Sequence, residues 1–193
     1  MAEWKLWSGK VPVFTTGEWY ATRERANHLE EEAHGERLQH AARLVGHACM
    51  AGAMSISDFG AGDGGLLMLV GREWAVPAWG YDLQQSNVKA AVEERKVDVR
   101  YADITRDKVE YGECLVICET LEHLEDPHGL LRNAPSKYLI ASVPDGETPE
   151  SHYEYHTWGW DIDGFGEMLE GAGYAAVIVT ARKGHLFGVG ERP

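Results

Sequence analysis

Residues 56–65 read Ile-Ser-Asp-Phe-Gly-Ala-Gly-Asp-Gly-Gly, and this stretch decides the fold. The pattern predicts a buried strand, a glycine-rich turn and then a helix through the apolar run 66–70. Glycines let a ligand approach the backbone closely, and a helix N-terminus adds unpaired N–H groups and a positive dipole end. We therefore expect a ligand with a carboxylate, a ribose or a phosphate at this turn.

Three carboxylates follow successive apolar runs. Asp58 ends the first run, where it suits a cationic amine better than a pyrophosphate. Asp82 follows the run 76–81, where a carboxylate can accept the two hydroxyl groups of a ribose. Asp103 follows the run 97–102, and its position suits an adenine amino group. The three acids favour an amine-bearing ligand that contains a nucleoside.

A dinucleotide site is an alternative interpretation of the same glycines. Gly60, Gly62 and Gly65 also match the pattern G-x-G-x-x-G, which would make the protein a nicotinamide-dependent oxidoreductase. That pattern is weak by itself. In addition, about fifty residues precede the motif, whereas a dinucleotide-binding domain most often starts with its first strand.

Four motifs in this order and spacing resemble those of class I S-adenosylmethionine-dependent methyltransferases: Asp58–Gly64, Tyr81-Asp82, Ala102-Asp103 and Cys118–Leu124. The similarity covers roughly residues 54–190. It implies an α/β fold, with a Rossmann-like, doubly wound, mostly parallel seven-stranded sheet, an antiparallel C-terminal hairpin and an N-terminal helical cap. It also implies S-adenosylmethionine as the cofactor and S-adenosylhomocysteine (SAH) as its product. The expected cofactor-binding residues are Asp58, Gly60, Ala61, Gly62, Asp82, Leu83, Asp103, Ile104 and Glu119.

The remaining apolar runs alternate with helical or turn-rich segments, as parallel strands require, because each parallel connection needs a crossover. Asp126-Pro127 and Asp161 are expected to start helices, and 174–180 with 185–189 predict the closing hairpin. The expected strands of the parallel part are 54–59, 76–81, 97–102, 114–118 and 137–143.

Length, composition and charge limit the class of protein. The chain has 193 residues, 44% of them hydrophobic, which predicts one domain over 1–193. Within it we expect an aromatic segment and helices over 1–52 and the Rossmann-like core over 53–193. The net charge of −13 and the lack of a Lys/Arg cluster argue against nucleic acid as a partner. A monomer or homodimer is expected.

Cysteine usage and hydropathy indicate the compartment. Cys49, Cys114 and Cys118 lie in apolar surroundings and are expected to be reduced. The N-terminus lacks the pattern of a secretion signal, and no run of about eighteen apolar residues predicts a membrane span. We expect a cytoplasmic protein with no membrane partner.

The first fifty residues are expected to cover the ligand site. Residues 1–20 carry Trp4, Trp7, Phe14 and Trp19 and are interpreted as a lid. The segment 22–52 predicts two helices, or one kinked helix, with a break at His34-Gly35 and a stop at Gly52. Its polar face is expected to be solvated, although Trp19, Tyr20, Arg25 and His28 are candidates to reach the site. The polar residues of that face are Arg23, Arg25, His28, Glu30, Glu31, Glu32, Glu36 and Arg37.

Methyl transfer requires an acceptor that is positioned and, for an O or N acceptor, deprotonated. His123 follows the fourth expected strand, and His152 and His156 lie in the loop 144–160, so each is a candidate base. The tyrosines, tryptophans and glutamates of that loop suit a small sugar-, nucleoside- or metabolite-like acceptor. The expected function is methyl transfer to such a small molecule.

Two alternatives stay open. In one, the protein binds S-adenosylmethionine without turnover. In the other, the acceptor is an RNA terminus, because Glu119, Glu122, His123 and His156 resemble the metal-binding set of small-RNA terminal 2′-O-methyltransferases. On a regular helix Glu122 and His123 would diverge by about 100°, so the four side chains would converge only if this segment is a loop. We expect instead that Glu122 is in solvent and that no metal binds.

Overall fold

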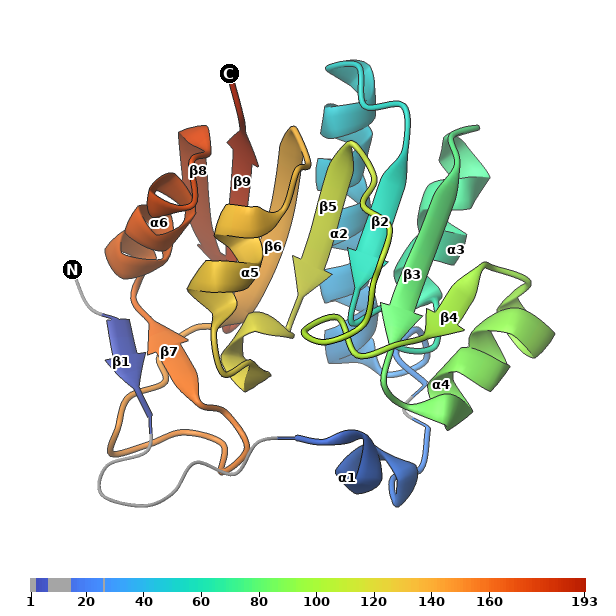
Figure 1. The fold of residues 1–193 in the computed structure, drawn as a ribbon, viewed down its shortest axis with the longest axis horizontal. Helices are drawn as coiled ribbons and strands as arrows, with labels where there is room; N and C mark the ends of the chain where they lie inside the picture. Colours follow the sequence, from blue (N-terminus) through green and yellow to red (C-terminus); the bar gives the residue numbers. More distant parts are fainter. Residues whose placement is uncertain (1–2, 7–14, 26) are drawn as a thin grey trace.

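A seven-stranded sheet with the order β4-β3-β2-β5-β6-β9-β8 lies at the centre of the computed structural model, which describes residues 3–6, 15–25 and 27–193 (Figure 1). β2 to β6 pair parallel with one another, and β9 is antiparallel to both β6 and β8. The predicted fold class is therefore confirmed. The strands are β2 (Ile56–Phe59), β3 (Ala78–Asp82), β4 (Val99–Tyr101), β5 (Cys114–Cys118), β6 (Tyr138–Pro144), β8 (Ala175–Arg182) and β9 (His185–Glu191).

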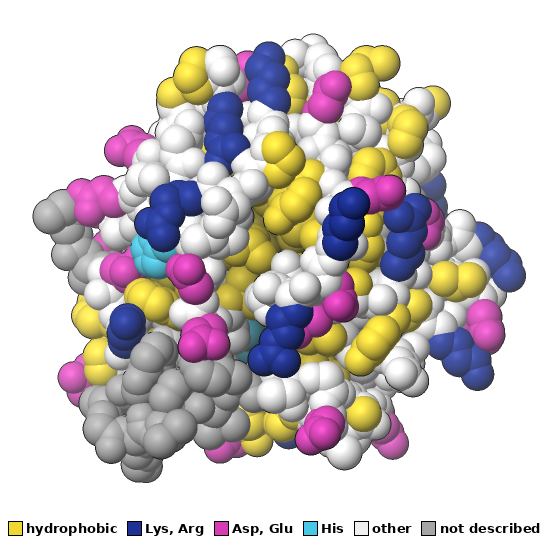
Figure 2. Space-filling view, in the orientation of Figure 1, with side chains coloured by type: hydrophobic (Ala, Val, Ile, Leu, Met, Phe, Trp, Pro, Cys, Tyr) yellow, Lys and Arg dark blue, Asp and Glu magenta, His cyan; other side chains and the backbone are white. Residues whose placement is uncertain are grey.

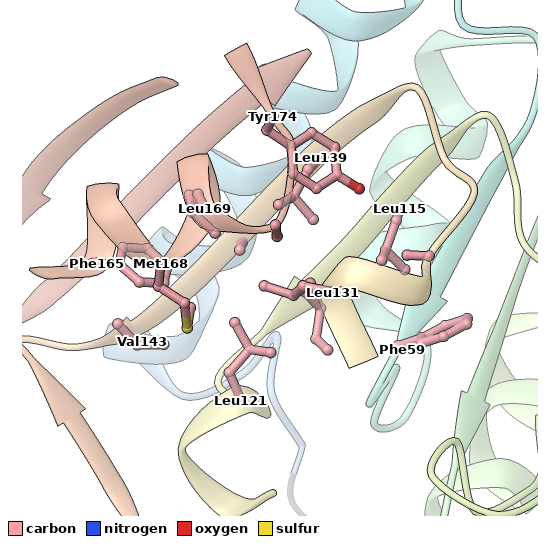
Figure 3. Packing of buried hydrophobic residues seen from close by; sticks show 14 of the residues in the cluster. Phe59, Leu115, Leu121, Leu131, Leu139, Val143, Phe165, Met168, Leu169 and Tyr174 are labelled. Carbon is pink, nitrogen blue, oxygen red and sulfur yellow. The ribbon is translucent and has the colours of Figure 1, made fainter. Parts of the chain in front are cut away.

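Helices α5 (Pro127–Asn133) and α6 (Ile162–Gly171) cover one face of this sheet. The caps predicted from sequence are present, since Asp126 and Asp161 each accept a hydrogen bond from the backbone N–H three residues on. Figure 3 shows their apolar side chains packed on the sheet. The labelled residues of this core are Phe59, Leu115, Leu121, Leu131, Leu139, Val143, Phe165, Met168, Leu169 and Tyr174.

Helices α2 (Glu32–Met50) and α3 (Gly65–Glu73) cover the opposite face, where α2 lies behind the sheet in Figure 1. Beside them, α4 (Gln85–Ala90) continues into a π-helical turn, η1 (Ala91–Arg95). The predicted break at His34-Gly35 is wrong, because α2 runs through both residues as one helix. Helix α2 ends just before Gly52, whose φ of 109° only glycine adopts easily, so the predicted stop is correct.

Two short elements of the N-terminal region lie far apart from each other in Figure 1. β1 (Glu3–Lys5) pairs antiparallel with β7 (Trp158–Trp160), so the loop after β6 contains a strand that the sequence did not predict. α1 (Gly17–Ala21) is capped by the side chain of Thr16. Trp7 and Phe14, which belong to the expected lid, lie outside the described residues.

Within the described part of the chain, no helix combines the length and the apolar character that a bilayer span requires.

Candidate active site

The carboxyl ends of β2, β3, β4 and β5 open into one cavity of about 1110 Å³. Ligands of open α/β sheets bind at this edge. All the expected cofactor residues line this cavity, and so do Glu122, His123 and His156. His152 is not among its lining residues, since its ring bonds the carbonyl of Thr148 within its own loop.

The glycine-rich turn that follows β2 is shaped by contacts that a side chain would destroy. Gly60 and Gly62 have φ of 78° and 56°, which disfavour any residue with a Cβ. A Cβ at Gly60 would lie 2.1 Å from the hydroxyl of Thr120, and one at Gly62 would lie 2.8 Å from the His28 ring. Neighbouring protein side chains, rather than a ligand alone, therefore require glycine at both positions.

Asp58, which is buried, and Asp82, which is half-buried, both present their carboxylates to the cavity. Burial raises the pKa of Asp58 to about 7, and the charge of Asp82 adds to this effect. Burial also raises the pKa of Asp82, although the N–H groups of Gln84 and Gly62 act in the opposite direction. Both N–H groups lie 2.8 Å from the Asp82 carboxylate and fix its orientation toward the glycine turn.

Asp103 and Ile104 follow β4 and line the same cavity. The Asp103 carboxylate accepts hydrogen bonds from the backbone N–H of Thr105, at 2.9 Å, and from its hydroxyl, at 2.6 Å. These contacts hold the carboxylate at the carboxyl end of β4. The three acids predicted from successive strands are therefore brought to one cavity.

Glu119, directly after β5, has a φ of 52°, which is unusual for a residue with a side chain. Its carboxylate accepts hydrogen bonds from the Ser142 hydroxyl at 2.8 Å and from the His185 ring at 2.9 Å. Arg37 of α2 lies 3.4 Å away. Burial opposes its ionisation, but His185 and Arg37 lower the pKa of Glu119 below its usual range. The carboxylate is therefore held within the protein as an ion.

Beyond Glu119 the chain forms a single 3₁₀ turn, η2 (Leu121–His123), instead of a helix. On this turn Glu122 and His123 converge with His156, and one ligand atom of each lies within 4.8 Å of the others. Glu122 is only 1% exposed, so the expectation that it lies in solvent is wrong. Neither of its carboxylate oxygens has a hydrogen-bond partner among the described residues, and burial raises its pKa well above the usual range.

The two histidine rings of this cluster are held by bonds at Nδ1. His123 Nδ1 lies 3.1 Å from the carbonyl oxygen of Tyr155, and His156 Nδ1 lies 2.6 Å from the carboxylate of Glu147. Both partners are acceptors, so both Nδ1 atoms carry a proton, and in a neutral ring the lone pair is then on Nε2. Burial lowers the pKa of His123 to about 4, and the nearby His156 adds a smaller effect in the same direction. The cluster therefore brings two imidazole rings and a buried carboxyl group together in the cavity.

Asp63, within the glycine turn, anchors a charge cluster that the sequence did not predict. Its fully buried carboxylate pairs with Arg95 of η1 and, at 3.1 Å, with Arg25. His28 lies 3.5 Å away. Burial alone would raise the pKa of Asp63, but the nearby His28 ring and the hydrogen bonds that the carboxylate accepts from Arg95 and Arg25 hold it well below its usual range. The segment before α2 is thereby fixed to the cofactor turn.

Two of the four candidates from the N-terminal segment reach the cavity. Tyr20 and His28 line it, whereas Arg25 acts through Asp63. Trp19 instead contacts the ring of Tyr155, with ring centroids 4.8 Å apart, and Arg23 lies over Trp19 at 4.1 Å. These contacts join α1, part of which lines the cavity, to the loop after β6.

A sheet in this order, with its cavity at the carboxyl ends of the parallel strands and a closing antiparallel hairpin, is the fold of class I S-adenosylmethionine-dependent methyltransferases. The N-terminal domain of EvdMO1 with SAH bound has a TM-score of 0.64 and 18% identity, covering 79% of this chain and 81% of that one. The methyltransferase domain of bacterial CtHen1-C has a TM-score of 0.64 and 17% identity, covering 81% of this chain and 98% of that one. The magnesium protoporphyrin IX methyltransferase ChlM of Synechocystis PCC 6803, with bound SAH, has a TM-score of 0.65 and 14% identity, covering 91% of this chain and 92% of that one.

Sequence comparison adds little to this likeness. No protein-family model matches the chain. The dual-specificity RNA methyltransferase RlmN of Dichelobacter nodosus (strain VCS1703A) is 41% identical over 64 residues, or 33% of this chain. The chain matches only 17% of that relative's length. The fold is thus established by the structural similarity.

Proposed function

We propose that the protein transfers a methyl group from S-adenosylmethionine to an O or N atom of a small-molecule acceptor. One observation carries this proposal: Asp58, Asp82 and Asp103 meet in one cavity that also contains the cluster of Glu122, His123 and His156. The three acids match the amine, the ribose and the adenine of the cofactor. The cluster supplies groups that act on an acceptor.

In the reaction, a lone pair of the acceptor attacks the methyl carbon of the sulfonium. The C–S bond breaks, its electron pair stays on sulfur, and SAH and a methylated acceptor result. His156 is the best-supported base, because its Nε2 lone pair is free for the acceptor proton and Glu147 orients the ring. His123 has a pKa of about 4, which makes it a weak base, and its position favours binding of the acceptor.

A small acceptor fits the charge of the protein better than a nucleic acid. The net charge is −13, and on the face shown in Figure 2 the described Lys and Arg side chains are interspersed with Asp and Glu. Nucleic-acid binding depends on phosphate neutralisation by a continuous basic surface. The described side chains on that face do not form one.

A second candidate, metal-assisted transfer, is favoured by the unpaired Glu122. A buried carboxylate without a partner, next to two imidazole lone pairs, fits a divalent cation with mixed O and N ligands. Glu122, His123 and His156 would hold the ion, and Glu119 would not, because Ser142 and His185 engage it. A bound ion would lower the pKa of neighbouring hydroxyls of the acceptor. The RNA terminal 2′-O-methyltransferase alternative depends on this site.

Binding and turnover can be tested separately. Calorimetry with SAH and with NADH should show binding of SAH alone, and NADH binding instead would favour the oxidoreductase alternative. SAH production from S-adenosylmethionine should then be followed with sugars, nucleosides and small metabolites. Tight SAH binding without turnover of any acceptor, RNA termini included, would favour a non-catalytic module.

Removal of metal ions with a chelator distinguishes metal-assisted methyl transfer from transfer without a metal. Activity that disappears after EDTA dialysis and returns with Mg²⁺, Mn²⁺ or Co²⁺ would support metal assistance. The matched control is Glu150→Gln, an exposed glutamate of the loop after β6 that lies outside the cavity lining. Glu122→Gln should abolish the metal response and Glu150→Gln should not. Activity that survives chelation unchanged would remove the metal candidate.

A further inference from the structure

We propose that Arg37 of α2 binds the carboxylate of the amino-acid end of S-adenosylmethionine and completes, with Asp58, a site for that zwitterion. This inference rests on the proposed function, because it assigns a further residue to the cofactor site. The sequence pattern placed Arg37 on a solvated helix face.

The first observation is the burial of Arg37. Its side chain is only 9% exposed, although it belongs to a helix whose polar face was expected to lie in water. The side chain lines the main cavity, and its Nε has no hydrogen-bond partner among the described residues. An unpaired donor on a buried guanidinium costs free energy unless a ligand accepts its hydrogen bond. The guanidinium therefore requires an acceptor from the cavity side.

The second observation is the charge around Asp58. Arg37 and Asp58 line the same cavity, and the positive charge of Arg37 lowers the pKa of Asp58 against the larger effect of burial. The amino-acid end of the cofactor carries an ammonium and a carboxylate on one carbon. In a ligand whose ammonium binds Asp58, the carboxylate is attached to the same carbon, and the planar guanidinium of Arg37, which lines the same cavity, can donate two parallel hydrogen bonds to it.

The third observation is how Arg37 is held. Glu119, 3.4 Å away, contacts one end of the guanidinium, and Ser142 and His185 fix Glu119 in turn. This support leaves Nε unpaired. Glu119 then acts as a positioning residue for Arg37, and direct contact between Glu119 and the cofactor is not needed.

His28 and His34 are the other described side chains of the N-terminal region that could carry a positive charge at this cavity. His28 lies 3.5 Å from the carboxylate of Asp63, so its ring already faces an acid of the protein. His34 pairs with Glu31 at 3.2 Å. Burial lowers the pKa of His34, and the positive charge of Arg37 lowers it further. Arg37 is therefore the better partner for a carboxylate, since it stays charged at any physiological pH.

The test compares ligands that differ at one group. SAH carries both charges, decarboxylated SAH keeps only the amine, and 5′-methylthioadenosine keeps neither. Arg37→Gln should weaken SAH binding by roughly 10- to 100-fold, the worth of a charge-assisted hydrogen bond, and should leave the other two ligands unchanged. Arg43→Gln, the same change at an exposed position of α2, is the control and should alter none of them.

The outcomes separate this inference from the proposed function. If the wild type binds none of the three ligands, the cofactor assignment itself is wrong. Suppose that the wild type binds SAH. If Arg37→Gln then loses affinity equally for all three ligands, or for none of them, Arg37 does not bind the carboxylate. Should Arg37→Gln fail to fold, the wild type alone still decides, because equal affinity for SAH and decarboxylated SAH would overturn the inference.

Discussion

Lowering the pH should weaken SAH binding through Asp58. Burial, with the nearby charge of Asp82, raises the pKa of the Asp58 carboxyl to about 7 in the ligand-free protein. Below that pH the carboxyl is protonated, whereas the ammonium of the ligand is bound best by the ionised form. Binding must then release a proton from Asp58, and the affinity must fall as the pH falls.

The size of the effect follows from a single linked proton. Each pH unit below the pKa costs a factor of ten in affinity, or about 1.36 kcal/mol. With a pKa of about 7, the expected loss between pH 8 and pH 5 is about 90-fold, or roughly 2.7 kcal/mol. The loss reaches this size only if the bound ligand keeps Asp58 ionised down to pH 5.

Calorimetry in two buffers of different ionisation enthalpy measures the protons released on binding. At pH 7 the expected release is about half a proton, because Asp58 is then about half protonated. Asp58→Asn should bind SAH weakly, with neither proton release nor a slope with pH from this site. A flat affinity between pH 8 and pH 5, or a slope that persists in Asp58→Asn, would refute this reasoning.

Three further predictions concern the walls of the cavity. Gly62→Val should abolish SAH binding, because its Cβ meets the His28 ring and its φ is positive, and calorimetry that shows normal affinity would place the cofactor elsewhere. Asp63→Asn should lower the free energy of unfolding by about 3–5 kcal/mol, since it removes a fully buried charge and leaves two half-buried arginines without their countercharge; urea denaturation that shows no loss would contradict this. Tyr20→Ala should lower turnover more than stability if α1 is a lid, and unchanged activity would argue against that role. This substitution tests the lid more cleanly than deletion of residues 1–20, which also removes the fully buried Leu6.

The sequence predicted the cofactor edge well, because its signals are local. Each of Asp58, Asp82 and Asp103 ends or follows an apolar run, and parallel strands bring their carboxyl ends to one edge. The closing hairpin was predicted for the same reason. Its turn, Lys183-Gly184, has positive φ at both residues, as a tight turn between antiparallel strands favours.

Residues that act across the fold were harder to predict. Arg37 and Glu36 are adjacent polar residues of one helix, yet the Arg37 side chain faces the cavity with only 9% of it exposed, whereas Glu36 pairs with Lys183 at the surface. Helical periodicity ranks faces by apolar content and does not detect a cavity that opens beneath a charged side chain. Asp63 was missed because its partners, Arg25 and Arg95, are distant in sequence.

The metal candidate depended on backbone geometry that the sequence leaves open. Glu122 and His123 converge because η2 is a single 3₁₀ turn, whereas helical spacing would separate them. Glu119 leaves the cluster because its φ of 52° directs its carboxylate toward Ser142 and His185. One unusual dihedral angle therefore separates a three-residue cluster from the four-residue set suggested by the motif.

The position of β9 between β6 and β8 affects how the chain can be made. During synthesis β6 (Tyr138–Pro144) emerges more than forty residues before β9 (His185–Glu191), its antiparallel neighbour. Until then, one edge of β6 presents unpaired backbone groups next to side chains that are buried in the finished sheet. A nascent chain that pauses in this interval exposes a strand edge that is prone to aggregation. We therefore expect chaperone binding to matter most during translation of residues 145–184.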